Sequence, residues 1–328
     1  MDESEEARVL AITKDYGELH QAILQLLLQV KSIGSHKLTR FVGDAVADIV
    51  IDEKTIKHRQ ENGNNDENDD GNEAETERSE NKTDNDVEEQ NEQRQNSREN
   101  RQLRIQVRKR LDDIEVLNTM GVINRRLTPL NLCIERMIDE NSTDDVESST
   151  DEAAYIYTLI NRKSTKVLQI STSFSEKEMK VISFLLDLMF GDSTADEDTS
   201  SRREHYSIAR YDTLNNIRSG FGYSMVEAEQ LMTRLVLDGW FELFDTSYSL
   251  TPRSLLELKD YLKEKYPSVS TCLACGQILV RGLECKVADC PVRFHSKCYQ
   301  FYKVAHQNDV SCPSKDCTGS LKDVVDFS

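Results

Sequence analysis

Seven of the eight cysteines lie after residue 271, and a histidine falls among them. The pattern reads C-x2-C-x9-C-x4-C-x4-H-x2-C-x13-C-x4-C, which gives four pairs of thiol or imidazole donors. Structural zinc is held tetrahedrally by four such donors, so eight donors match two Zn²⁺ ions. The sequence therefore predicts a finger with two zinc ions. The eight expected ligands are Cys272, Cys275, Cys285, Cys290, His295, Cys298, Cys312 and Cys317.

Two other kinds of cysteine chemistry fit this pattern less well. A disulfide framework belongs to secreted chains, and the N-terminal MDESEEARVL lacks the basic and apolar regions of a signal peptide. A catalytic thiol would need one cysteine rather than seven. A segment of about 50 residues also builds only a small core, so we expect metal to supply much of its folding free energy. The lone Cys133 lies on an apolar face, expected to be helical, where an inert buried thiol is anticipated.

The formal net charge of −18 is concentrated in three polar segments. Residues 61–90, 139–152 and 192–198 together carry −22, so the rest of the chain carries about +4. The segment near 61–90 favours a solvated linker over a mimic of nucleic acid. No apolar run approaches the roughly 18 residues of a membrane span, so we expect a soluble, intracellular chain without membrane contact.

Apolar residues recur at helical spacing over 19–30, 38–49 and 103–117, and Pro129 is expected to begin a further helix through residues 132–137. The runs 153–162 and 166–170 are rich in β-formers and predict a hairpin. A helix follows, opened by a Ser175–Glu178 capping box. Residues 52–100 contain almost no aliphatic side chains and are expected to be disordered.

A second helix-to-hairpin arrangement begins with a capping box at Ser224 and Glu227. The helix leads into GWFELF, a turn at 245–247 and YSLT, and Thr251 with Pro252 then opens a closing helix. The fold class expected is α+β and mainly helical, with tandem winged-helix domains and a C-terminal finger. The expected boundaries are 8–50 with 101–190 for the first winged helix, interrupted by 52–100; 203–267 for the second; 270–320 for the finger; and 321–328 for a tail.

The order of seven cysteines with histidine fifth is similar to that of RING-variant and PHD-type fingers, which hold two zinc ions in a cross-brace. That resemblance implies one site of Cys272, Cys275, His295 and Cys298, and another of Cys285, Cys290, Cys312 and Cys317. The stretches ELHQAILQLLLQV, YTLINRKSTKVLQISTSFSEKEM and SMVEAEQLMTRLVLDGWFELFDTSYSLTPRSLLELKDYLKEKYP resemble the family of non-SMC element 1 subunits of the SMC five/six chromosome-maintenance complex. The resemblance covers roughly 17–50 and 101–318.

The resemblance implies a nuclear, chromatin-associated subunit that acts in DNA repair and recombination. Its implied partners are a MAGE-type subunit, a kleisin subunit and a ubiquitin-conjugating enzyme, and its implied activity is that of a RING-type ubiquitin ligase. Such a ligase forms no covalent intermediate and acts by positioning. Apolar Ile278 and Leu279 and the later Pro313 are the residues expected to dock the conjugating enzyme.

Two alternatives to the ligase stay open. Thr318 follows the last cysteine where many active RING domains have a basic residue, and the last cysteine pair is spaced by four, so a purely structural zinc module is one alternative. A DNA- or chromatin-binding module is the other, with weak phosphate contacts from Arg234, Arg253, Lys259 and Lys263. A histone reader ranks behind these, because only Tyr299, Phe301 and Tyr302 lie near enough for an aromatic cage.

Overall fold

The computed structural model describes residues 3–63, 81–111, 113–139, 155–162, 174–191, 206–287, 290–306 and 311–327. The chain forms two compact units. Unit 1 comprises Met1–Val30 and Ser35–Thr128, and unit 2 comprises Lys31–Gly34 and Pro129–Ser328. None of the helices in the described ranges combines the length and apolar character needed to cross a lipid bilayer.

Unit 1 is helical wherever the structure describes regular elements. Its helices are α1 (Glu3–Lys14), α2 (Glu18–Val30), α3 (Ser35–Gly63), α4 (Asn81–Arg110) and α5 (Asp113–Leu127). Side chains spaced four residues apart on α2 and α3 are buried, as expected for amphipathic helices that pack together. They are Leu19, Ile23 and Leu27 on α2 and Leu38, Val42 and Val46 on α3.

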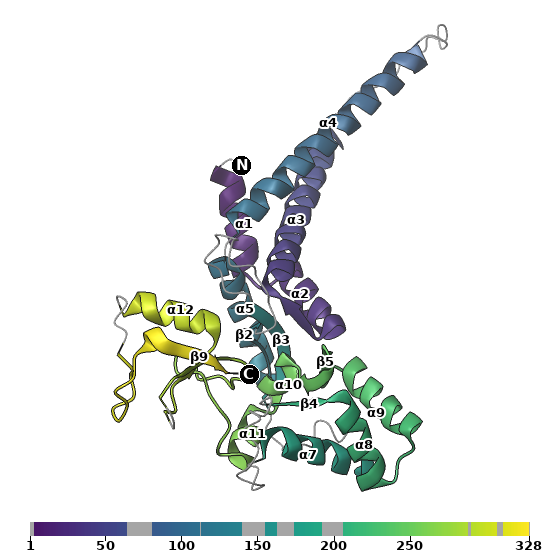
Figure 1. Cartoon of the computed structure of the whole chain (residues 1–328). Helices are drawn as coiled ribbons and strands as arrows, with labels where there is room; N and C mark the ends of the chain where they lie inside the picture. The colour runs from purple at the N-terminus through teal and green to yellow at the C-terminus, as the bar shows by residue number, and fades with distance from the viewer. Residues whose placement is uncertain are drawn as a thin grey trace. The chain divides into compact units, whose positions relative to one another are not determined.

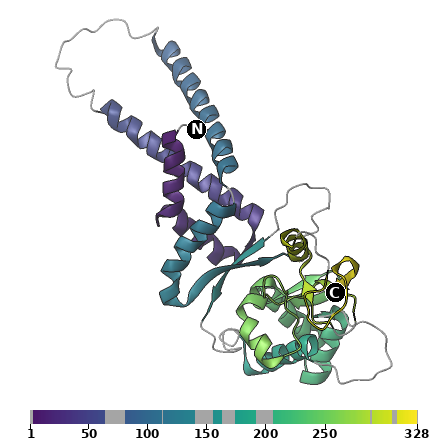
Figure 2. The same ribbon diagram turned by 90° about the vertical axis from the view of Figure 1, so that its left-hand side faces the viewer.

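Helices α3 and α4 correct the expectation of disorder over 52–63 and 81–100, while 64–80 lie outside the described residues. Helix α3 continues to Gly63 and α4 begins at Asn81, and both views show the two helices projecting beyond the rest of unit 1 (Figures 1 and 2). Glu, Gln, Lys and Arg are good helix formers even where they bury nothing. Ion pairs also join the helices near their base, between Arg104 and Asp48 and between Arg108 and Asp44.

The first sheet of unit 2 is antiparallel with the order β1-β3-β2. Its strands are β1 (Ser32–Gly34), β2 (Leu132–Ile138) and β3 (Tyr155–Asn161). The sequence placed a helix over 132–137, and this prediction was wrong, because Leu132–Ile138 is strand β2. The first strand of the hairpin predicted over 153–162 and 166–170 is confirmed as β3, and the second run lies outside the described residues. Only a short 3-10 turn, Thr128–Leu130, surrounds Pro129, and β2 then pairs with β3 from Leu132 opposite Asn161 to Ile138 opposite Tyr155. Cross-strand pairing therefore overrides the helical spacing of these residues. Residues 163–173 lie outside the described part of the chain.

The second sheet has the order β4-β6-β5. Its strands and the neighbouring helices are α7 (Glu176–Phe190), β4 (Ser207–Ala209), α8 (Arg210–Phe221), α9 (Met225–Leu237), β5 (Phe241–Phe244), β6 (Ser247–Leu250), α10 (Pro252–Glu257) and α11 (Lys259–Lys265). Both expected capping boxes are present, at Ser175 and Ser224, and Thr251 caps α10 with Pro252 in its first turn. The expected closing helix is interrupted at Leu258.

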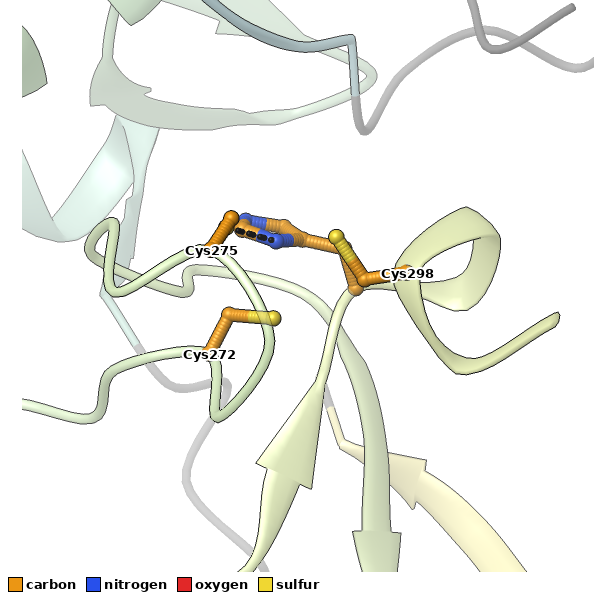
Figure 3. Close-up of side chains that lie close together, drawn as sticks. Cys272, Cys275 and Cys298 are labelled. Atoms are coloured by element: carbon orange, nitrogen blue, oxygen red, sulfur yellow. Dashed lines mark hydrogen bonds between the residues drawn. The ribbon is translucent and has the colours of Figure 1, made fainter. Parts of the chain in front are cut away.

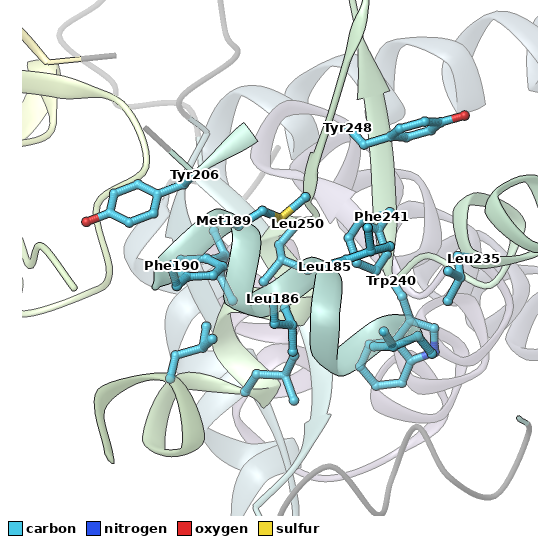
Figure 4. Packing of buried hydrophobic residues seen from close by; sticks show 14 of the residues in the cluster. Leu185, Leu186, Met189, Phe190, Tyr206, Leu235, Trp240, Phe241, Tyr248 and Leu250 are labelled. Carbon is cyan, nitrogen blue, oxygen red and sulfur yellow. The ribbon is translucent and has the colours of Figure 1, made fainter. Parts of the chain in front are cut away.

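A large apolar cluster unites these elements of unit 2. Figure 4 shows Leu185, Leu186, Met189 and Phe190 of α7 packed among side chains of the second sheet and α9. Tyr206 stacks on Phe190 with ring centroids 4.9 Å apart. The cluster extends to Ile278, Leu279 and Val280. Residues of the finger are therefore part of the main core of unit 2.

The finger contains a third antiparallel sheet with the order β8-β7-β9. Its elements are β7 (Gly282–Cys285), β8 (Arg293–Phe294), α12 (Ser296–Ala305), a 3-10 turn (Leu321–Asp323) and β9 (Val324–Phe327). The expected tail at 321–328 thus contributes a strand to the finger, because Val324–Phe327 pairs with the whole of β7. Leu321 is fully buried beneath it.

Candidate metal centres

The first centre joins the loop before β7 to the start of α12. Cys272 and Cys275 lie in a tight turn in which the Gly276 N–H donates to the Cys272 carbonyl at 2.8 Å, and Gly276 takes a φ of +68°. His295 follows β8 and Cys298 lies in the first turn of α12. The four ligand atoms lie within 4.8 Å of one another. Figure 3 shows the labelled cysteines of the loop and of α12 facing the same space.

The second centre gathers Cys285, Cys290, Cys312 and Cys317, again within 4.8 Å of one another. Cys285 ends β7, and an isolated bridge between Ser311 and Ser320 closes the loop that carries the last two cysteines. The first and third ligand pairs in the sequence therefore share one centre, and the second and fourth pairs share the other. This interleaving is the cross-brace arrangement.

The donor atoms are spaced for tetrahedral zinc. A Zn–S bond of about 2.3 Å places sulfurs of a tetrahedral site about 3.8 Å apart. The Sγ atoms of Cys285 and Cys317 are 3.7 Å apart, and those of Cys290 and Cys312 are 3.6 Å apart. His295 turns its Nδ1 to within 3.4 Å of Cys275 Sγ, so Nδ1 is the nitrogen that would bind zinc in the first centre. All eight cysteines are free thiols, and the expected pair of zinc ions fits both donor sets.

Hydrogen bonds within the centres shift the pKa values of individual thiols. The pKa of Cys272 is lowered, chiefly because Cys275 and Cys298 donate hydrogen bonds to its sulfur. The Gly319 N–H donates to Cys317 Sγ at 3.3 Å and is the main cause of the lowered pKa of that thiol. Burial instead raises the pKa of Cys133 to about 11, which agrees with the inert thiol expected there, although it lies on β2 and not on a helix.

Segment 277–281 fixes the finger to the rest of unit 2. The Gln277 side-chain amide donates to the Arg136 carbonyl of β2 at 2.7 Å, and Arg281 lies over the ring of Phe244 at 4.6 Å. Ile278 and Leu279 are only 2% and 0% exposed. The expectation that these two side chains dock a conjugating enzyme is therefore corrected, because they are part of the core cluster.

Exposed apolar residues of the finger lie elsewhere. Pro313 is exposed as expected. Leu273, in the turn of the first centre, is 49% exposed and was missed by the sequence interpretation. Its position between Cys272 and Cys275 could have predicted this exposure, because a short turn has no interior in which to bury a leucine. Thr318 is exposed beside the second centre.

Three of the four basic residues expected to contact DNA are bound to groups of unit 2. They are Arg234, paired with Glu178; Arg253, paired with Glu257 at 3.1 Å; and Lys263, which donates to the Gly276 carbonyl at 3.1 Å. Lys259 is half-buried. Residues 206–267 carry seven basic and nine acidic side chains, which does not favour a phosphate-binding surface there.

Two family models match this chain. The model described as "Nse1 non-SMC component of SMC5-6 complex" matches residues 108–258, and the one described as "RING-like domain" matches 272–317, which includes all eight ligands. Over residues 108–258 the chain is therefore similar to the Nse1 family. The RING-like match agrees with the cross-brace geometry of the two centres.

Relatives named "Non-structural maintenance of chromosomes element 1 homolog" match part of this chain. The Homo sapiens protein is 27% identical over 183 residues, which are 55% of this chain and 60% of that protein. The Mus musculus protein is 28% identical over 153 residues, 46% of this chain and 53% of that protein. The chain therefore matches between half and two thirds of the length of these relatives.

A chain in a solved structure of an "Nse1-Nse3-Nse4 complex" has a similar fold. The TM-score is 0.53 at 17% sequence identity, and the alignment covers 95% of this chain and 99% of that chain. At this identity the likeness concerns the fold alone. It agrees with a mainly helical α+β architecture that ends in the cysteine-rich finger.

Proposed function

We propose that this chain is a nuclear, chromatin-associated subunit of an SMC5-6 complex that acts in DNA repair and recombination. The match of residues 108–258 to the Nse1 family model supports this role, because that family is described as a component of the complex. The solved structure of similar fold is a complex that contains Nse3 and Nse4 beside Nse1. These correspond to the MAGE-type and kleisin partners implied by the sequence resemblance.

Tandem winged-helix domains are the proposed means of holding these partners. The order helix, strand, helix, helix, strand, strand occurs twice along the chain, apart from α4. It runs once through α2, β1, α3, α5, β2 and β3 and again through α7, β4, α8, α9, β5 and β6. Helix α7, which the sequence analysis assigned to the first domain, is thus proposed to begin the second. In both sheets the first strand pairs with the third and the third with the second. In the sequence, the extended end of α3 and helix α4 are inserted before α5, the third helix of the first winged-helix domain.

The finger is proposed to act as a RING-type ubiquitin ligase. The observation that carries this proposal is the pair of interleaved four-ligand centres within the RING-like match. In such a ligase the zinc ions shape the docking surface, and the finger holds the thioester of a charged conjugating enzyme for attack by a lysine amine. An amide bond then forms as the thiol of the conjugating enzyme leaves, and the finger contributes only positioning.

Leu273 and Pro313 are the proposed apolar docking residues. Both are exposed, in contrast to Ile278 and Leu279, and each follows a zinc ligand directly in the sequence. A docking surface of this kind needs exposed apolar side chains on a rigid support. The two zinc centres would provide that support.

Ubiquitin chain formation with a panel of conjugating enzymes tests the ligase, in the presence and absence of the MAGE-type partner. We expect chains with at least one enzyme, and at least roughly tenfold fewer chains for Leu273→Ala. Val304→Ala is the matched control, because Val304 is 75% exposed on α12 and follows no ligand. Absence of chains in every combination, with two zinc ions bound, would exclude the ligase.

A structural zinc module is the second candidate. Burial of Ile278 and Leu279 in the core of unit 2 favours it, because these side chains give the finger an architectural task that needs no conjugating enzyme. Thr318 in place of a basic residue favours it as well. In that case the variants at Leu273 and Val304 would behave alike, and loss of zinc would affect stability and assembly only.

A further inference from the structure

Helix α4 has an uneven distribution of charge. Residues 94–110 contain seven basic side chains and one acidic side chain, Glu99, in a chain whose net charge is −18. The family match begins at residue 108, so most of this basic stretch precedes it. Its charges divide into two groups with different surroundings.

Three of the arginines bind carboxylates of unit 1. Arg104 pairs with Asp48, and the Nε of Arg108 donates to Asp44 at 2.7 Å. Arg110 donates to Glu6 at 2.6 Å and to Glu115 at 3.2 Å. These three side chains fasten α4 to its neighbouring helices, and their charge is neutralised within the fold.

The other four basic residues form what we call the basic face of α4. Arg94, Arg98, Arg101 and Lys109 are spaced so that a helix of 3.6 residues per turn places them on one side. That side is opposite the buried Leu103 and Val107 of the same helix. All four side chains are exposed, and none of the carboxylates in the described part of the chain forms an ion pair with them.

The basic face has the dimensions of a nucleic-acid backbone contact. From residue 94 to residue 109 the helix rises about 22 Å, which spans several phosphates of a DNA strand. A shallow groove of about 550 Å³ borders the face and is lined by Asn96, Ser97, Asn100, Arg101 and Arg104. The amides and the hydroxyl of this groove add uncharged hydrogen-bond donors of the kind that commonly contact phosphate oxygens.

We propose that the basic face of α4 binds double-stranded DNA through its phosphates, without reading the base sequence. A protein partner would need an apolar centre to the contact, and Ile105, 45% exposed, is the one large apolar side chain on this face of the described helix. Phosphate binding needs only positive charge, which the face supplies. The proposal does not depend on the ligase activity of the finger.

Fluorescence anisotropy of a duplex of about 20 base pairs with the full-length, zinc-loaded chain tests the proposal. Four phosphate contacts predict a slope of log affinity against log salt of about −3.6, so binding weakens roughly 100-fold between about 50 and about 200 mM salt. The triple variant Arg94→Gln, Arg98→Gln, Arg101→Gln should bind about tenfold more weakly at low salt, with a slope of about −1. Circular dichroism checks that the variant keeps its helix content.

Two further variants distinguish binding at the basic face from a general effect of the net charge of the chain. The triple lysine variant at Arg94, Arg98 and Arg101 keeps the charge and should keep most of the affinity. A matched control removes the same charge from exposed positions on α1 and α3, with the substitutions Lys14→Gln, Lys37→Gln and Arg40→Gln, and should bind like the original chain.

Three outcomes would overturn the proposal. They are affinity that the Gln variant does not change, affinity that salt does not change, and equal loss of binding in the control variant. Competition with poly-glutamate tests the alternative that the basic face binds an acidic protein segment. If the Gln variant loses binding to poly-glutamate but keeps its affinity for DNA, the face serves an acidic protein segment instead.

Discussion

His20 joins the end of α1 to the start of α2 through both of its ring nitrogens. The Gly17 N–H donates to Nδ1 at 3.2 Å, so Nε2 carries the proton and donates to the Thr13 carbonyl at 3.3 Å. The ring is fully buried, and burial is the main reason that its pKa is lowered from 6.5, against the opposing carboxylate of Asp15. The neutral imidazole is therefore part of the folded structure.

Unit 1 should lose stability below about pH 6.5 because of this histidine. There the unfolded chain binds a proton that the folded chain resists, so the free energy of unfolding falls as the pH falls, and the contribution is fully present above that range. Urea unfolding of the full chain at about pH 5.5 and about pH 7.5, followed through helix content by circular dichroism, measures the effect. His20→Gln should reduce the difference in unfolding free energy between the two pH values. An unchanged difference would assign the effect to other groups.

Gly282 opens β7 at a position where a side chain has no room. A Cβ there would overlap the carbonyl oxygen of Phe294 on the neighbouring strand and lie 3.0 Å from Leu279 Cδ1. Gly282→Ala should therefore destabilise unit 2 by about 2 kcal/mol or more. Gly220→Ala is the control, because a Cβ at that helical position meets nothing within 4 Å and should be neutral or slightly stabilising. If thermal unfolding shows the same stability for both variants, this result would argue against the close approach at Gly282.

At the scale of elements, segment 277–281 belongs to the packing of unit 2 as much as to the finger. Leu279→Ala should cost about 2–5 kcal/mol of unfolding free energy, since it opens a cavity in the main cluster. Leu273→Ala should cost less than about 0.5 kcal/mol, because Leu273 is half exposed. Chemical denaturation of both variants measures the difference. Equal and small effects would mean that the finger does not rest on this core in solution.

Elements with local signals could be predicted from the sequence. The capping boxes at Ser175 and Ser224, the hairpin at 241–250 and the ligand pattern of the finger each depend on neighbours in the chain. Strand β2 could not be predicted, because its partner β3 lies beyond a long acidic segment and its own spacing suits a helix equally well. Helices α3 and α4 were missed over 52–63 and 81–100 because low hydrophobicity was taken to mean disorder.

Interactions between residues distant in the sequence explain the remaining differences between the expectations and the structure. Burial of Ile278 and Leu279 follows from packing against elements far away in the chain, such as the contact of Gln277 with Arg136, 141 positions apart. The engagement of Arg234 with Glu178 likewise joins α9 to α7. Such long-range pairings leave no periodic pattern in a single sequence. A basic residue that is exposed therefore cannot be told from one that is ion-paired by sequence alone.

At the scale of the whole molecule, zinc should stabilise unit 2 and leave unit 1 unaffected. The finger supplies Ile278, Leu279 and Val280 to the cluster that also holds α7 and the second sheet, whereas unit 1 buries its own apolar face. Hydrogen exchange before and after chelation measures this directly. Protection should fall in α7, α8 and α9 together with the finger and persist in α2 and α3. Retained protection in α8 and α9 of the chelated chain would mean that the finger is an independent appendage.

Assembly with two partners is the central claim about the molecule as a whole. The most direct measurement is co-expression with the MAGE-type and kleisin subunits, followed by size-exclusion chromatography and metal analysis of the peak. We expect a stable ternary complex with two zinc ions per copy of this chain, and loss of both ions and of the complex for Cys298→Ser. A chain that binds two zinc ions and elutes alone from an otherwise formed partner complex would contradict this assembly.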